Sequence, residues 1–329
     1  MKVSATESKK DGISISVSTE PSNTNTCKGS SHATCYTQVS PPLNQVLREQ
    51  PVTDSSVVDS VRLNQNQIIM ATADRVWVYS PDSGNHNNFL PQPSTSNSNI
   101  GNIEATKKLL DTAIILGKRA ASVERRLPDL NLTTWIWSLV SQYHTTQPTP
   151  QLMKEAAQRF EVKGRHCLAE WAEEKALEET GHDRLALLDI QSLGYQAQAV
   201  VNTFMPPSAK VLVDYFIRSV QTSDPIRVVG YSYTLERIAL AVQEKHIQAI
   251  EAIIPSGINA TRCLRVHSSI GSDVEHVAEN LEIIAASTPA ERNDIAIACY
   301  ETAKRYFSIR ENDYPSTTEQ QQKLEAFKY

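Results

Sequence analysis

From about Ile103 to Phe307 the chain is a succession of apolar residues at helical spacing, interrupted by proline and glycine. Its first segment, IEATKKLLDTAIILGKRAASVERRL, carries apolar residues three and four positions apart, which places them on one face of a helix. Stretches such as QPTP, MPPSAK and PSG separate the later segments, because proline cannot continue a helix. No convincing strands alternate with these segments. The pattern predicts an all-α domain of about seven helices packed as a bundle.

The composition excludes several classes of partner. Lys and Arg total 32 and Asp and Glu total 37, a net charge of −5, so no broad basic field exists for nucleic acid or an acidic membrane surface. The longest apolar runs fall far short of the about 20 residues that span a bilayer. The first residues, MKVSATESKKDGISISVSTE, lack the apolar core of a signal peptide. The five cysteines form no CxxC pair, so we expect a reducing, cytoplasmic location.

Residues 1–100 differ in composition from the rest of the chain. Stretches such as NHNNFLPQPSTSNSN are rich in Ser, Thr, Asn, Gln and Pro and bury too little apolar surface to offset the ordering entropy. We therefore expect a low-complexity, mostly disordered arm. Within it, QIIMATADRVWVYSPDSG has two β-prone runs and a turn signal, which predicts a short hairpin at 66–80. The helical domain then covers 101–310, and 311–329 form a C-terminal tail.

The stretch EETGHDRLALLDI, which begins at Glu178, joins an acidic half to an apolar half. On a single helix Glu178 is four residues and Glu179 three residues before His182, so either glutamate can share a face with the imidazole. Carboxylates and imidazoles that project inward from facing helices hold iron in helical bundles, and these donors suit iron or manganese. The alternative is a solvated helix face that carries a histidine by chance.

Two later motifs add candidate metal ligands. HSSIGSDVEH supplies His267, Asp273 and His276, of which Asp273 and His276 are three apart on one face. His267 shares that face only if the helix is distorted or begins near Gly271, the arrangement that we favour because glycine tolerates irregular backbone angles. Glu236 lies among apolar residues in GYSYTLERIAL, where a carboxylate is costly unless it is paired or binds a metal.

The order of these motifs resembles the haem-oxygenase-like iron-containing redox enzymes, the diiron oxidases and oxygenases of that superfamily. The resemblance covers about Ile103 to Phe307 and implies a seven-helix bundle without haem. It also implies two Fe(II) ions that activate O2 to oxidise a small-molecule substrate. The positions that match the family's metal ligands are Glu178 or Glu179, His182, Glu236, His267, Asp273 and His276. Asp183 and Asp189 are candidates for orienting the imidazoles.

Two features depart from the family. Five residues separate His267 from Asp273, a longer spacing than the family's. Some relatives carry a further carboxylate two turns before the first histidine, where this chain has Glu174 and Lys175. A centre with one iron, or with a loosely held second iron, is therefore an alternative to the diiron centre.

Other classes of protein remain open on the sequence alone. A related helical fold includes a cofactor-free oxidase and a thiaminase-like hydrolase with a cysteine nucleophile, a role that Cys167 or Cys263 would have to take. A lone cysteine among apolar residues is more often inert. A non-enzymatic helical interaction module, with its acidic motifs facing water, is the third alternative. As partners we expect O2 and a small-molecule substrate, with no nucleic acid and no membrane; a homodimer stays open.

Overall fold

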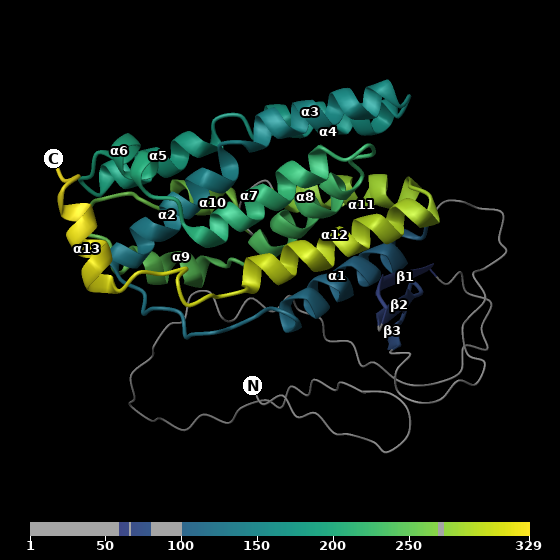
Figure 1. Ribbon diagram of the computed structural model, residues 1–329, viewed down its shortest axis with the longest axis horizontal. Helices are drawn as coiled ribbons and strands as arrows, with labels where there is room; N and C mark the ends of the chain where they lie inside the picture. The colour runs from purple at the N-terminus through teal and green to yellow at the C-terminus, as the bar shows by residue number, and fades with distance from the viewer. Residues whose placement is uncertain (1–58, 66, 80–100, 269–272) are drawn as a thin grey trace, which may run out of the picture.

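The computed structural model describes residues 59–65, 67–79, 101–268 and 273–329, without the side chains of 273–275. These residues form an elongated stack of helices with a small sheet near one end and α13 at the other (Figure 1). The strands are β1 (Asp59–Asn64), β2 (Gln67–Ala71) and β3 (Val76–Tyr79). The helices are α1 (Ile103–Arg119), α2 (Leu132–Thr146), α3 (Thr149–Val162), α4 (His166–Glu178), α5 (His182–Ser192), α6 (Ala197–Thr203), α7 (Pro207–Val220), α8 (Arg227–Ala239), α9 (Glu244–Glu251), α10 (Arg262–Val266), α11 (Asp273–Ala286), α12 (Pro289–Phe307) and α13 (Thr317–Glu325).

The predicted all-α class is confirmed, but several helices are shorter than the sequence segments over which apolar residues keep helical spacing. The residues from 149 to 195, which continue the helical spacing of apolar residues with Gly164 and Gly181 among them, form three helices, α3, α4 and α5. Gly164 and Gly181, at the two breaks, have φ of +69° and +93°, a left-handed conformation that glycine adopts without strain. The segment around the motif HSSIGSDVEH likewise contains two helices, α10 and α11. No helix in the described part of the chain is long and apolar enough to cross a bilayer.

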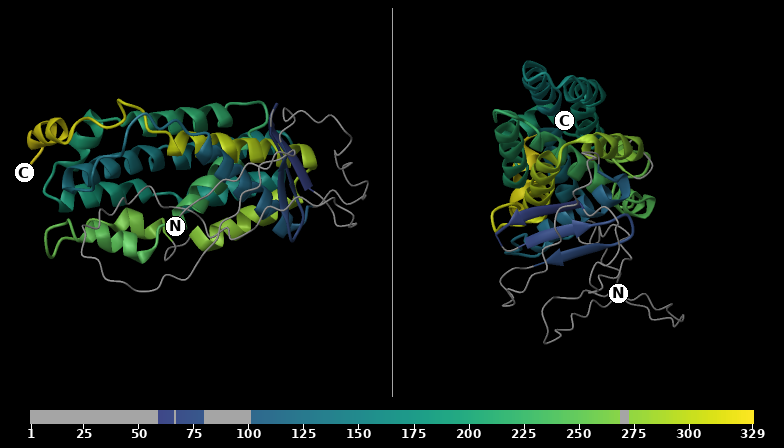
Figure 2. Two further views of the ribbon diagram at one scale, coloured as in Figure 1. Left: turned by 90° about the horizontal axis from the view of Figure 1, so that it is seen from below. Right: turned by 90° about the vertical axis from the view of Figure 1, so that its right-hand side faces the viewer.

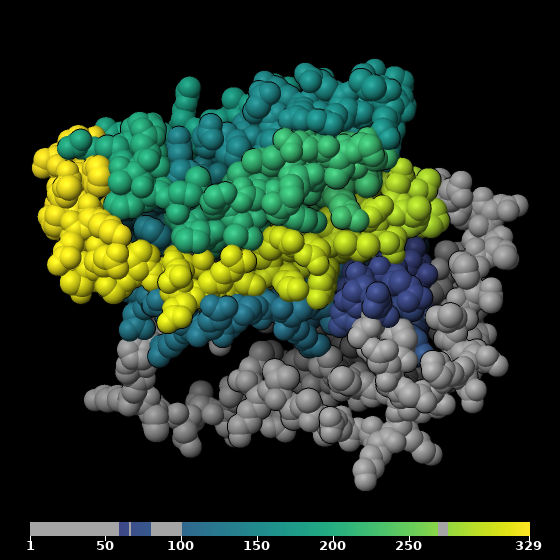
Figure 3. All heavy atoms as spheres, in the orientation of Figure 1, coloured from purple at the N-terminus to yellow at the C-terminus, as the bar shows by residue number. Residues whose placement is uncertain are grey.

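Helix α12 packs closely against α1 and α8, and Figure 3 shows it running along one face of the molecule. Gly117 of α1 and Gly230 of α8 meet it at the two crossings. A Cβ atom on Gly117 would overlap the backbone carbonyl of Tyr300, and one on Gly230 would overlap that of Ile295. The absence of a side chain at these two glycines therefore sets how closely both helices approach α12.

The sheet is antiparallel in the order β1–β2–β3 and lies against α1 and α12 (Figure 2). Strands β2 and β3 pair within the segment for which a hairpin was predicted, whereas β1 extends the sheet beyond it. Val61 and Ile69 face the apolar core that α1 and α12 share, so the sheet is docked rather than isolated. Residues 1–58 and 80–100 of the predicted arm lie outside the described residues.

The C-terminal segment, predicted as a tail, contains helix α13. Leu324 of α13 is buried in a second apolar cluster that includes Trp135 and Leu139 of α2. Ser316 caps the helix by accepting a hydrogen bond from the backbone N–H of Glu319. This segment is therefore part of the packed domain.

Candidate metal centre

The acidic motif does not lie on one continuous helix. Helix α4 ends at Glu178, Glu179 is its C-terminal cap, and α5 begins at His182. Gly181, with φ of +93°, makes the turn between them. The expectation of a single helix is thus wrong, because a left-handed residue ends the α-helical hydrogen-bond ladder. The corner still keeps Glu179 beside His182, since the backbone N–H of His182 donates to the Glu179 carbonyl at 3.3 Å.

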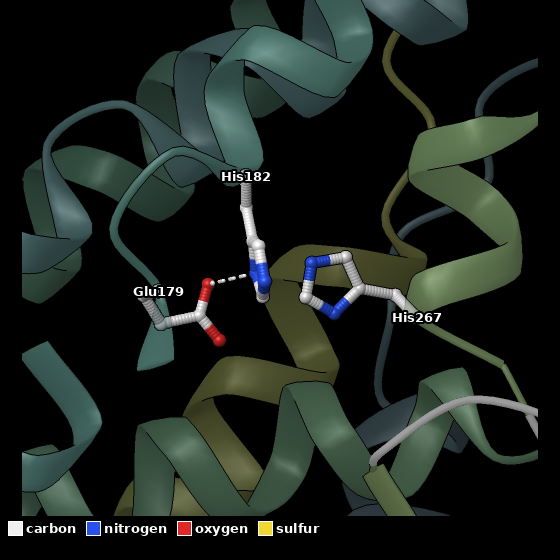
Figure 4. Close-up of side chains that lie close together, drawn as sticks. All are labelled: Glu179, His182 and His267. Carbon is white, nitrogen blue, oxygen red and sulfur yellow. Dashed lines mark hydrogen bonds and ion pairs between the residues drawn. The ribbon is translucent and has the colours of Figure 1, made fainter. Parts of the chain in front are cut away.

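Glu179, His182 and His267 converge on one point (Figure 4). One potential ligand atom from each lies within 4.8 Å of the other two. Nδ1 of His182 is 3.0 Å from Oε2 of Glu179, and the His182 and His267 rings meet edge to face with centroids 4.7 Å apart. His267 caps the C-terminus of α10 with φ −94° and ψ 71°, so it comes from a different helix from His276. We call these three residues the triad.

The triad carboxylate is held in its charged form. Burial would raise the pKa of Glu179, but the hydrogen bond from His182 and the nearby charges of His267, His182 and His276 outweigh it and lower that pKa. The pKa of Tyr231, which lies within electrostatic range of Glu179, shifts in the opposite direction. Burial first, and then the negative charge of Glu179, raise the pKa of its phenol. An ionised carboxylate therefore lies near a phenol that stays protonated.

Asp189 of α5 links this helix to α10, the helix that ends one residue before His267. Its fully buried carboxylate accepts hydrogen bonds from the backbone N–H of Cys263 at 3.1 Å and from Nη1 of Arg262 at 2.9 Å. These bonds fix α10 against α5. Asp189, expected to orient an imidazole, thus acts on the helix that carries His267 rather than on a ring.

A second polar group is centred on Lys175, whose side chain is only 2% exposed. Its Nζ lies 2.8 Å from Oε2 of Glu178, 3.4 Å from Oε2 of Glu279 and 3.9 Å from Oε1 of Glu236. Burial would lower the pKa of Lys175, but Glu236, Glu178 and Glu279 together raise it. We call these four residues the lysine group.

Glu236 is further fixed by neutral donors. Its carboxylate accepts hydrogen bonds from Nδ2 of Asn280 at 2.5 Å and from the Ser232 hydroxyl at 3.1 Å. Trp171 Nε1 in turn donates to Oδ1 of Asn280 at 2.8 Å, which orients the amide. Helices α4, α8 and α11 therefore meet at one buried polar network.

The residues predicted for a single centre are distributed over these two groups. Glu179, His182 and His267 form the triad, whereas Glu178 and Glu236 bind Lys175. His276 lies between the groups: its Nε2 is 3.4 Å from Oε2 of Glu178, and its charge also acts on Glu179. The Asp273 side chain is outside the described residues, and Glu174 is exposed to solvent.

Sequence reasoning missed the role of Lys175, although a signal was present. The buried residues of α4 include Leu168, Trp171, Ala172 and Ala176, and position 175 falls on the same face at spacings of three, four and seven. A lysine on the apolar face of a helix needs buried partners. The many glutamates around it made the stretch resemble a solvated surface instead.

Comparisons with known proteins give one structural similarity. No protein-family model matches the sequence, and no curated protein matches it. Among solved structures, the chain is similar to a domain of unknown function with a haem oxygenase-like fold from Shewanella denitrificans OS217. The two are 16% identical, the match covers 67% of this chain and 90% of that one, and the TM-score is 0.45. A similarity of this extent carries no argument about the chemistry of the site.

Proposed function

We propose that the triad binds one Fe(II) ion and that the protein is a non-haem iron oxidase or oxygenase, using O2 to oxidise a small molecule. The observation that carries the proposal is the convergence of one carboxylate and two imidazoles within 4.8 Å. Two histidines and one carboxylate are the ligand set of non-haem Fe(II) oxygenases. Iron held in this way supplies electrons to O2 and leaves coordination positions open for O2 and substrate.

The chemistry of the donors fits such an ion. Glu179 is ionised, as a carboxylate ligand must be, because the histidines lower its pKa. The Nδ1 atom of His182 lies 3.0 Å from Oε2 of Glu179, and a ring nitrogen binds a cation only when it carries no proton. Metal binding at the triad should therefore release protons, as is general for sites with imidazole ligands. Tyr231 provides a protonated phenol within electrostatic range of Glu179.

One ion is proposed in place of the two that the family resemblance implies. Glu178 and Glu236, two of the positions that match the family's metal ligands, face the ammonium of Lys175. The three residues of the triad supply the protein ligands for one ion, and the lysine group contributes none of them.

The rival classes have weaker support. Burial raises the pKa of the Cys263 thiol, which keeps it protonated and unreactive, so Cys263 is a poor nucleophile for a thiaminase-like reaction. Cys167 is exposed, on the outer side of α4. A non-enzymatic module with its acidic motifs in water is disfavoured because the side chains of Glu179 and His182 are only 15% and 17% exposed.

The proposal is tested by anaerobic titration with Fe(II). Calorimetry monitors the binding, and iron analysis after gel filtration gives the number of ions per chain. We expect one ion per chain in the wild type, with binding strongly reduced in His182→Ala and His267→Ala. His166→Ala is the matched control, because His166 also pairs with a glutamate, Glu161, at 2.9 Å but on the surface. Oxygen consumption by the iron-loaded protein then tests the oxidase. A wild type that binds no Fe(II) would overturn the proposal and favour the interaction module.

A further inference from the structure

We infer that the Lys175 ammonium takes the place of a second metal ion, so that the protein binds a single ion although further carboxylates lie beside the triad. The inference rests on the proposed function for the triad ion, but concerns the residues beside it. Lys175 is thereby a residue that determines metal stoichiometry, distinct from the residues that bind the metal.

The burial of Lys175 needs an explanation, because lysine is almost never fully buried without partners. Its side chain is 2% exposed, and three carboxylates surround its Nζ at 2.8 to 3.9 Å. These carboxylates come from three different helices: Glu178 from α4, Glu236 from α8 and Glu279 from α11. A cation bound from several helices at once, by oxygen atoms, is the arrangement typical of a metal ion in a helical bundle.

The lysine group adjoins the triad. Glu178 of the lysine group is the neighbour of Glu179 of the triad in the chain, and His276 contacts Glu178 while its charge lowers the pKa of Glu179. Glu178, Glu236 and His276 thus offer the oxygen and imidazole donors that suit a first-row metal. The ammonium already lies between the three carboxylates and offsets one of their charges, and its positive charge would repel a divalent ion placed among them.

Replacement of the lysine should therefore open a second metal site. Lys175→Met keeps the length and apolar body of the side chain but removes its charge. Lys175→Glu reverses the charge and adds a ligand, and Lys175→Arg keeps the charge as the matched control. The readouts are ions per chain after anaerobic titration with Fe(II), and separately with Co(II), whose visible absorption reports on its ligands.

We expect one ion in the wild type and in Lys175→Arg, and one additional ion in Lys175→Met and Lys175→Glu. An unchanged stoichiometry in folded Lys175→Met and Lys175→Glu would overturn the inference. Should neither variant fold, the wild type decides: saturation at one ion under excess Co(II) supports the inference, and a second ion overturns it.

The two proposals fail in different ways. A wild type that binds no ion contradicts the triad site, yet a gain of one ion in Lys175→Met would still support the role of the lysine. Combining His182→Ala with Lys175→Met separates the sites directly, since the double variant should lose the triad ion and keep the new one.

Discussion

Asp59, the first residue of β1, forms a buried ion pair with Arg292 of α12, although 233 positions separate them in the chain. Nε of the guanidinium lies 2.6 Å from Oδ2 of the carboxylate, and the two side chains are 6% and 7% exposed. The backbone N–H of Arg62 adds a hydrogen bond to Asn293 at 2.7 Å. The sheet is therefore fastened to the helical domain by polar contacts as well as by its apolar face.

Asp59→Ala should lower the free energy of unfolding by about 3–5 kcal/mol, because it removes the buried carboxylate that pairs with the Arg292 guanidinium. The control is Asp294→Ala on the same helix. The side chains of Asp294 and of its partner Arg227 are each 42% exposed. That change should have an effect of less than about 1 kcal/mol. Urea unfolding followed by circular dichroism measures both. Equal effects of the two substitutions would contradict the structural role of the Asp59 pair.

The fold class could be predicted because apolar spacing and helix breakers are local features. The breaks at Gly164 and Gly181 could not be placed with certainty, since a glycine inside a helical pattern is either tolerated or used in its left-handed form. Three of the residues in the motifs, Glu179, His182 and His267, also lie together in the structure. The division between the triad and the lysine group depends on tertiary contacts of α4 with α8 and α11. Lys175 and Glu236 are 61 positions apart in the sequence, so no local pattern predicts that they pair.

His267 and His276 should contribute differently to iron binding. His267 lies in the triad, so His267→Ala should weaken Fe(II) binding by more than about 100-fold, beyond the 10- to 100-fold range typical of residues that only support a ligand. His276 contacts Glu178, and His276→Ala should weaken binding by about tenfold. Anaerobic calorimetry on the two single variants gives both constants. If His276→Ala has the larger effect, the triad has been assigned to the wrong histidine.

Asp189 should support the triad from a distance. Asp189→Asn keeps the shape of the side chain but removes the charge that faces Arg262 at 2.9 Å. We expect an about tenfold loss of Fe(II) affinity, because α10 is then less firmly held and His267 moves with it. The Co(II) absorption spectrum should be retained, since no ligand is lost.

Ser192→Ala serves as the comparison for Asp189, because Ser192 also accepts a hydrogen bond from Arg262, at 3.2 Å. It leaves the bond between Asp189 and the Cys263 backbone intact. Its Fe(II) affinity should match that of the wild type. A loss as large as that in Asp189→Asn would assign the effect to Arg262 rather than to the fixing of α10.

The stability of the metal-free protein should depend on Glu179 at acid pH. The pKa of Glu179 is lowered from its ordinary value of 4.5 in the folded state, so its ionisation stabilises the fold above pH 4.5. That contribution is lost as the pH falls below 4.5 and through the folded-state pKa. The difference in free energy of unfolding between the wild type and Glu179→Gln should therefore shrink on acidification. Urea titrations from pH 7 to pH 3, with chelator present, measure it; a difference independent of pH would contradict the assignment.

The buried position of Lys175 has a consequence for how the proposed iron site would be assembled. Many small metal-binding domains are unfolded without their metal, and carboxylates left without a cation repel one another. A lysine is covalently part of the chain, so the cation that pairs with Glu178, Glu236 and Glu279 cannot diffuse away. If the triad holds Fe(II) as proposed, loss of the ion would leave a single carboxylate there, Glu179, which is paired with His182. We therefore expect the bundle to persist without metal and the proposed ion to bind after the chain has folded.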